Sequence, residues 1–131
     1  MTPKNILTLI GALLGLQGIG LFLGAEAITA EAFKLWNPDD TGIKIGTMLH
    51  QAMGALSLAV GIILLSARSL APAASAKVLM GGAIGLVITT GQAFFHMATT
   101  DVNPPMPLLI MMSILAIVAL VTANKAKDAA A

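Results

Sequence analysis

Cysteine and tyrosine are absent from this chain of 131 residues, and charged residues make up only 10% of it. Without cysteine there can be no disulfide, no thiolate metal site and no cysteine nucleophile. With so few charges, a chain that is 57% hydrophobic could not cover a water-soluble domain with polar groups. The net charge of +1 is too small to indicate nucleic acid as a partner. The composition therefore indicates a membrane protein.

Four apolar runs fill most of the sequence, and each is long enough for a helix that crosses a bilayer. They cover approximately residues 5–24, 43–66, 77–99 and 105–123. Roughly 20 residues at about 1.5 Å per residue span about 30 Å of hydrocarbon. Runs of this length without polar alternation must be helical in lipid, because a helix satisfies its own backbone hydrogen bonds. We expect an all-α fold: one membrane domain over residues 1–131, built as an up-down four-helix transmembrane bundle.

The basic residues are concentrated at the N-terminus, between the second and third runs, and at the C-terminus: Lys4, Arg68, Lys77, Lys125 and Lys127. Four crossings place these three parts on one side of the membrane, and the positive-inside rule makes that side cytoplasmic. The other two connections hold most of the acidic residues. We therefore expect a multi-pass protein of the plasma or inner membrane with both termini in the cytoplasm.

The outer segment 25–42 is the longest connection between runs. Its apolar residues predict one side of a short interfacial helix: Ile28, Phe33, Leu35 and Trp36. Asp40 or Thr41 is a candidate N-cap for the second span. The first 27 residues imitate a secretory signal that ends in Ala25-Glu26-Ala27, and we expect them to be retained as the first span.

Each of the two histidines shares a narrow helical face with small or polar residues. At about 100° per residue, the first face holds Gly46, His50, Gly54, Ser57 and Gly61, and the second holds Gly82, Gly85, Thr89, Gln92 and His96. Small residues allow transmembrane helices to approach closely, and Ser, Thr, Gln and His form hydrogen bonds between them. We expect both histidines to point into the bundle near its outer surface and to approach each other, with Gln17 and Gln51 nearby.

Four interpretations of this histidine cluster stay open. The imidazoles could be structural, in neutral form and bonded to Gln92, Gln17 and backbone carbonyls. They could be axial ligands of a haem, although helices packed about 8 to 10 Å apart leave little room for a macrocycle. With Met53 and Met97 they could bind copper, because thioether and imidazole suit Cu(I). A quinone or another lipid-like molecule could also bind, with its head group bonded by His and Gln.

The first span carries small residues on two sides. Gly11, Gly15 and Gly18 share one side, and Gly20 and Gly24 lie on another side with Gln17. A single contact within the bundle needs only one of these sides. Because glycines at this spacing allow close helix approach, we assign the Gln17 side to the bundle. The side of Gly11, Gly15 and Gly18 is then predicted to contact another subunit or a second copy.

A recognisable layout is formed by the Gly-rich first span, by Leu21-Phe22-Leu23-Gly24-Ala25-Glu26, by His50-Gln51-Ala52-Met53-Gly54-Ala55-Leu56-Ser57 and by Ala67-Arg68. This layout resembles the DoxX-like group of small four-helix membrane proteins. The resemblance implies a four-helix membrane fold and, as for some members of that group, partnership with membrane oxidoreductases. It implies no catalytic residue.

The spans contain no cluster of acid, base and nucleophile, so an enzyme is the least supported class. We expect a non-enzymatic membrane subunit that contacts lipid and a protein partner, or that forms a homo-oligomer. The alternative is a membrane protein that binds a cofactor or ligand through His50 and His96.

Overall fold

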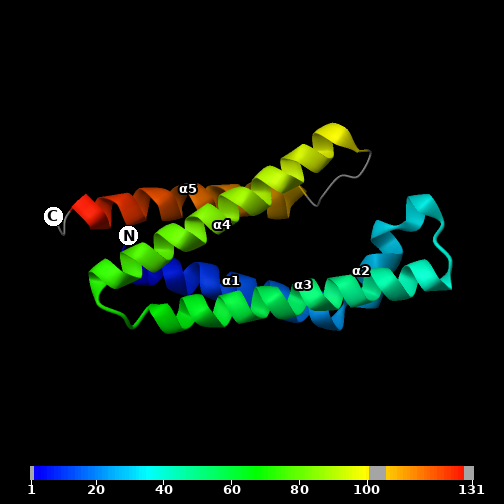
Figure 1. The fold of residues 1–131 in the computed structure, drawn as a ribbon, viewed down its shortest axis with the longest axis horizontal. Helices are drawn as coiled ribbons and strands as arrows, with labels where there is room; N and C mark the ends of the chain where they lie inside the picture. Colours follow the sequence, from blue (N-terminus) through cyan, green and yellow to red (C-terminus); the bar gives the residue numbers. More distant parts are fainter. Residues whose placement is uncertain (1, 101–105, 129–131) are drawn as a thin grey trace. The chain divides into compact units, whose positions relative to one another are not determined.

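The computed structural model describes residues 2–100 and 106–128. Within these residues all regular structure is helical: α1 (Pro3–Leu23), α2 (Ala25–Ala32), the short 3-10 helix η1 (Lys34–Trp36), α3 (Asp40–Ala67), α4 (Pro72–Thr99) and α5 (Met106–Asp128) (Figure 1). By length and composition, α1, α3, α4 and α5 are the four helices that could cross a membrane. The prediction of an all-helical protein with four candidate spans is therefore confirmed.

The chain divides into two compact units. Unit 1 consists of Met1–Ile10 and Ser66–Ala131, and unit 2 consists of Gly11–Leu65. Unit 1 thus contains α4, α5 and the first turns of α1. Unit 2 contains the rest of α1, together with α2, η1 and nearly all of α3.

In unit 1, α4 and α5 lie side by side and run in opposite directions (Figure 1). On α4 the buried residues recur every three or four positions: Ala76, Leu79, Ala83, Leu86 and Thr90. Such spacing places side chains along one seam of a helix. The buried residues of α5 are mainly small or aliphatic: Leu109, Leu115, Ala116, Ala119, Thr122 and Ala123. The first turns of α1 add the buried Ile6, Leu7 and Ile10 to the core of this unit.

The turn before α4 is closed by Ser75, which is buried. The hydroxyl of Ser75 lies 3.2 Å from the carbonyl oxygen of Ala67 and 3.0 Å from that of Leu70. Pro72 occupies the first turn of α4, where its missing N–H leaves no hydrogen bond unmade. The connection between α3 and α4 is therefore short and fixed by side-chain hydrogen bonds.

In unit 2, α1 and α3 form an antiparallel hairpin (Figure 1). The two backbones touch where glycines face each other. A Cβ atom added to Gly18 would lie 2.6 Å from the carbonyl oxygen of Gly54, and one added to Gly61 would lie 2.7 Å from that of Gly11. The hydroxyl of Ser57 also donates to the carbonyl of Leu14 at 3.0 Å. The glycine face predicted on the second span thus packs against α1.

The connection between α2 and α3 contains one left-handed residue, Asn37, with φ of 44°. Asparagine adopts this conformation more readily than other non-glycine residues. The side chain of Asp39 then accepts a hydrogen bond from the backbone N–H of Gly42 at 2.7 Å. The N-cap of α3 is therefore Asp39, which corrects the prediction of Asp40 or Thr41, because α3 already begins at Asp40.

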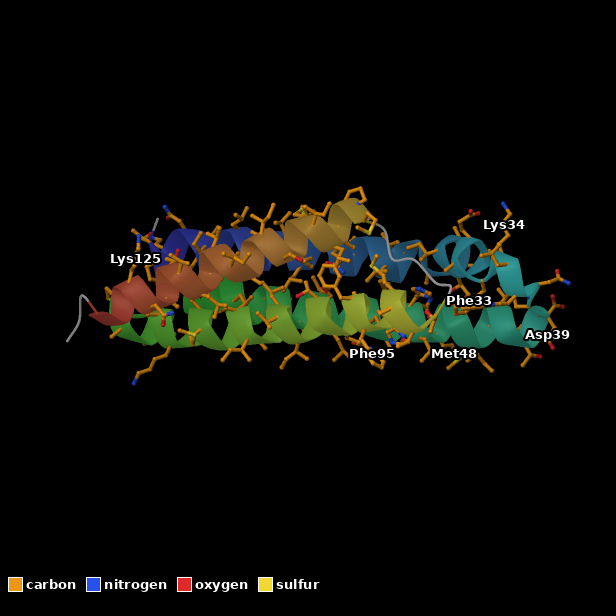
Figure 2. All side chains as sticks on the ribbon, turned by 90° about the horizontal axis from the view of Figure 1, so that it is seen from above. Phe33, Lys34, Asp39, Met48, Phe95 and Lys125 are labelled. Carbon is orange, nitrogen blue, oxygen red and sulfur yellow. The ribbon has the colours of Figure 1, made fainter. Side chains whose placement is uncertain are left out.

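The outer segment is helical, but its apolar residues do not share one environment. Phe33 packs on α3 beside Gly46 and His50, whereas Leu35 is 87% exposed and Trp36 60% exposed. Figure 2 labels Phe33, Lys34 and Asp39 close together at one end of unit 2. This end of the hairpin carries the exposed aromatic and charged groups that suit a membrane interface.

Candidate functional site

The inner side of α2 builds one wall of a cluster around His50. Ala25, Thr29 and Phe33 are spaced four residues apart and therefore face the same way. Ala25 and Thr29 are buried, and the rings of Phe33 and His50 lie 6.3 Å apart between centroids. The cluster thus joins α2 to the N-terminal part of α3 within unit 2.

The Nδ1 atom of His50 lies 2.9 Å from the carbonyl oxygen of Gly46 and 2.9 Å from Oγ1 of Thr29. The hydroxyl of Thr29 lies 2.7 Å from the carbonyl oxygen of Ala25, to which it donates. A carbonyl oxygen only accepts, so Nδ1 of His50 must carry the hydrogen and share it between Gly46 and Thr29. In the neutral imidazole the lone pair is then on Nε2. No residue that the structure describes bonds to Nε2.

The approach of α2 to α3 depends on the missing side chain of Gly46. A Cβ atom added there would collide with Cγ2 of Thr29 and with the ring of Phe33. Gly46 is itself buried. Any larger residue would have to displace the side chains of Thr29 and Phe33, and with them the contact of α2 with His50.

Two glutamines predicted beside the histidines are also in unit 2. Oε1 of Gln17 is buried and has no hydrogen-bond partner among the described residues. Gln51 is half-buried. Neither side chain bonds to His50 within the described part of the chain. A buried amide oxygen without a partner is uncommon in folded proteins. Gln17 therefore stays a candidate for a hydrogen bond with a group other than the described residues.

The predicted face of α4 does not enter the core of unit 1. Of the predicted face, Gly82 is half-buried, whereas Gly85, Thr89, Gln92 and His96 are exposed. Together with the exposed Gly81, these four residues form what we call the α4 stripe. The five residues lie within about 80° of arc at about 100° per residue, and the centre of this arc is about 140° from the centre of the buried seam. A Cβ atom added at Gly81 or Gly85 would meet nothing within 4 Å. Within unit 1, α4 packs on α5 through another side of the helix, so the orientation of His96 toward the bundle stays a prediction.

The glycine face of α1 also differs from its prediction. Gly11, Gly15 and Gly18 all lie against α3, with Gly61 opposite Gly11 and Gly15. A Cβ atom added at Gly20 would meet nothing within 4 Å. The assignment of Gly11, Gly15 and Gly18 to another subunit is therefore wrong. The spacing of the glycines indicates that either side of α1 could pack closely against a helix. In the structure α3 packs against the side of Gly11, Gly15 and Gly18.

The residues predicted for a metal or cofactor are divided between the two units. His50 and Met53 belong to unit 2, and His96 and Met97 to unit 1. Their approach stays a prediction. Within residues 2–100 and 106–128, no three His, Asp or Glu side chains gather as a metal-binding group. The hydrogen bonds of His50 involve Nδ1. Nε2 is therefore the atom of this ring that could coordinate a metal or accept a hydrogen bond.

Sequence reasoning missed Thr29 and Phe33, which hold the imidazole of His50. Their spacing from Ala25 is a helical signal that the sequence does contain. An interfacial helix is predicted from the apolar residues of this segment alone, and Thr29 is not one of them. A threonine on the same side as Phe33 was the available indication that this helix has an inner face.

The comparisons with known proteins add no relative to this description. No family model and no curated protein matches the sequence, and no solved structure matches the fold.

Proposed function

We propose that this protein is a non-enzymatic integral membrane subunit that associates with a second copy of itself through the α4 stripe. The observation that supports the proposal is the exposure of polar and small side chains along an apolar helix long enough to cross a membrane. Lipid-facing positions are normally apolar, because hydrocarbon cannot satisfy a polar group. An exposed polar stripe in such a helix therefore calls for a partner.

Gln92 supplies the polar contact of the stripe. Lys77 and Gln92 are about 22 Å apart along the helix axis at about 1.5 Å per residue. With Lys77 at the cytoplasmic boundary, the amide of Gln92 lies within the hydrocarbon layer, which is about 30 Å thick. This amide has no hydrogen-bond partner among the described residues, whereas the hydroxyl of Thr89 already donates to the carbonyl of Gly85 at 2.8 Å. A partner helix would satisfy Gln92.

A second copy fits this stripe better than an unrelated helix. Gly81, Gly85 and Thr89 are four residues apart, the small-residue spacing at which transmembrane helices approach closely. Two copies inserted in the same orientation hold their Gln92 residues at the same depth. An amide both donates and accepts, so the two side chains can bond each other reciprocally. Such self-complementarity is what a two-fold interface requires.

Cysteine cross-linking tests this association, because the natural chain has no cysteine. We expect Thr89→Cys to form a disulfide-linked dimer when native membranes are mildly oxidised. A single cysteine per chain can pair only with another copy. Val87→Cys is the matched control, because Val87 is 46% exposed but lies about 160° from Thr89 around α4. The control is expected to stay monomeric on a denaturing gel.

Two further substitutions in the Thr89→Cys background separate packing from hydrogen bonding. We expect Gly85→Leu to weaken association at least about tenfold, because leucine prevents close approach. Gln92→Ala should weaken it about threefold, the usual size of one hydrogen bond between membrane helices. The proposal is wrong if Thr89→Cys gives only monomer, as it would if another part of the same chain covered the stripe. It is equally wrong if Val87→Cys links as efficiently.

The proposed topology places both termini in the cytoplasm. We expect a membrane-impermeant maleimide to label Glu31→Cys in right-side-out vesicles, and Ser69→Cys only after the vesicles are permeabilised. Both positions are exposed in the structure, so access depends on the side of the membrane rather than on burial. The physical reason is the basic character of the segments beside Ser69. Labelling of Ser69→Cys from outside would reverse the topology.

A further inference from the structure

The imidazole of His50 is held in one orientation and in one tautomer. Its Nδ1–H is shared between the carbonyl of Gly46 and the hydroxyl of Thr29, each at 2.9 Å. Thr29 cannot reverse its role, because its own hydrogen is donated to Ala25 at 2.7 Å. Phe33 lies beside the ring. Three contacts therefore fix where Nε2 points, and in the neutral imidazole they leave Nε2 as a hydrogen-bond acceptor.

We infer that His50 is a ligand site in which Nε2 accepts a hydrogen bond from a neutral amphiphile with a hydroxyl head group. The site is independent of the proposed association through α4. An accepting lone pair selects molecules that donate, such as phenols, quinols and alcohols. A molecule with only carbonyl or ether oxygens leaves Nε2 without a bond, because two acceptors cannot pair.

The surroundings of His50 favour an apolar body behind this head group. Leu49 and Met53, next to His50 and one turn further along α3, are large apolar residues that are more than half exposed. Helix α3 is one of the four helices apolar enough to cross a membrane. A molecule that reaches Nε2 from the lipid therefore meets aliphatic side chains, as ligands in apolar sites with a few polar anchors do.

A metal is the less favoured occupant of this site. Metal centres in proteins are normally held by three or four side chains. No three His, Asp or Glu side chains gather within the described residues. One imidazole is enough, in contrast, to accept one hydrogen bond from a hydroxyl group.

Nitrogen NMR tests the tautomer without any ligand. The chain has two histidines, so ¹⁵N-labelled imidazoles give two resolvable spin systems, and the variant His96→Phe assigns them. We expect the neutral imidazole of His50 to carry its hydrogen on Nδ1 and none on Nε2 in detergent or nanodiscs. A hydrogen found on Nε2 with a bare Nδ1 would overturn the inference, whatever the outcome of the binding experiments.

A matched pair of probes tests the ligand class. 4-Nonylphenol carries a donating hydroxyl, and 4-nonylanisole has the same body with the hydroxyl methylated. We expect the phenol to bind about fivefold more tightly, the effect of one ordinary hydrogen bond, and to shift the Nε2 resonance of His50. Cholesterol and its methyl ether form a second pair, which distinguishes a membrane alcohol from a phenolic ligand as the source of the hydroxyl.

Two variants localise the effect. His50→Phe should remove the difference between phenol and ether, and His96→Phe should keep it. The NMR measurement on the unsubstituted protein keeps the test valid if His50→Phe does not fold. The inference is overturned if neither donor probe binds. It is also overturned if donors and their ethers bind equally, or if the preference survives His50→Phe.

Discussion

Replacing Gly18 with alanine is expected to destabilise the hairpin of α1 and α3 by about 1 to 3 kcal/mol, the usual cost of overpacking a close contact. The new Cβ atom would lie 2.6 Å from the carbonyl oxygen of Gly54 and 2.6 Å from the backbone nitrogen of Leu58. These neighbours are backbone atoms, so no side-chain rotation can relieve the collision. The two helices must separate along this contact. Reversible unfolding in mixed detergent micelles, followed by circular dichroism, measures the change.

Gly20→Ala is the control for this prediction. Gly20 lies on the same helix, but a Cβ atom added there meets nothing within 4 Å. We expect Gly20→Ala to leave the free energy of unfolding unchanged or to raise it slightly, since alanine has a higher helix propensity than glycine. Equal stability of the Gly18→Ala and Gly20→Ala variants would mean that α1 and α3 do not touch at Gly18.

Replacing Gly46 with alanine is expected to detach α2 from α3 while leaving the apolar part of the hairpin folded. The added methyl collides with Cγ2 of Thr29 and with the ring of Phe33, on which the position of α2 depends. The single tryptophan, Trp36, reports this locally, because its ring lies 5.5 Å from that of Phe33 between centroids. We expect altered Trp36 fluorescence and faster amide hydrogen exchange in α2.

A second substitution, at Thr29, separates the collision of the added methyl group with Cγ2 of Thr29 from other effects of alanine at position 46. Thr29→Ser removes Cγ2 but keeps the hydroxyl that bonds to His50. Combined with Gly46→Ala, it should restore part of the Trp36 signal and of the hydrogen-exchange protection, because the collision with the ring of Phe33 stays. Thr29→Val alone should weaken the hold on the imidazole without displacing α2, because valine keeps the shape and loses the hydroxyl. If Thr29→Ser brings no recovery in the Gly46→Ala background, the collision with the ring of Phe33 alone is enough to displace α2.

The helical fold could be predicted from the sequence because lipid leaves few choices for the backbone. Four runs of about 20 apolar residues must each satisfy their own hydrogen bonds, and only helices do so within one segment. The observed helices exceed these runs: α3 starts at Asp40 and α4 at Pro72. Polar caps outside the hydrocarbon extend a helix beyond its apolar part, as Asp39 does for α3.

The candidate site could be predicted only in part. The face of α3 with Gly46, Gly54 and Gly61 was correct, because glycine at helical spacing allows close approach. Thr29 and Phe33 come from a helix outside the apolar runs, and their contact with His50 is a long-range one. Hydrophobic periodicity describes one helix at a time, so it does not identify the partner of a side chain on another.

By itself the sequence determined that this protein has four helices able to cross a membrane, and which residues share each helical face. Tertiary structure decided which face meets which neighbour. Gly18 and Gly20 both suit close packing by residue type, yet only Gly18 touches α3. The tautomer of His50 was decided in the same way, since it depends on the carbonyl of Gly46 and the hydroxyl of Thr29 converging on one nitrogen. The physical reason is that periodicity fixes directions around a helix axis, whereas contacts depend on how two axes pack.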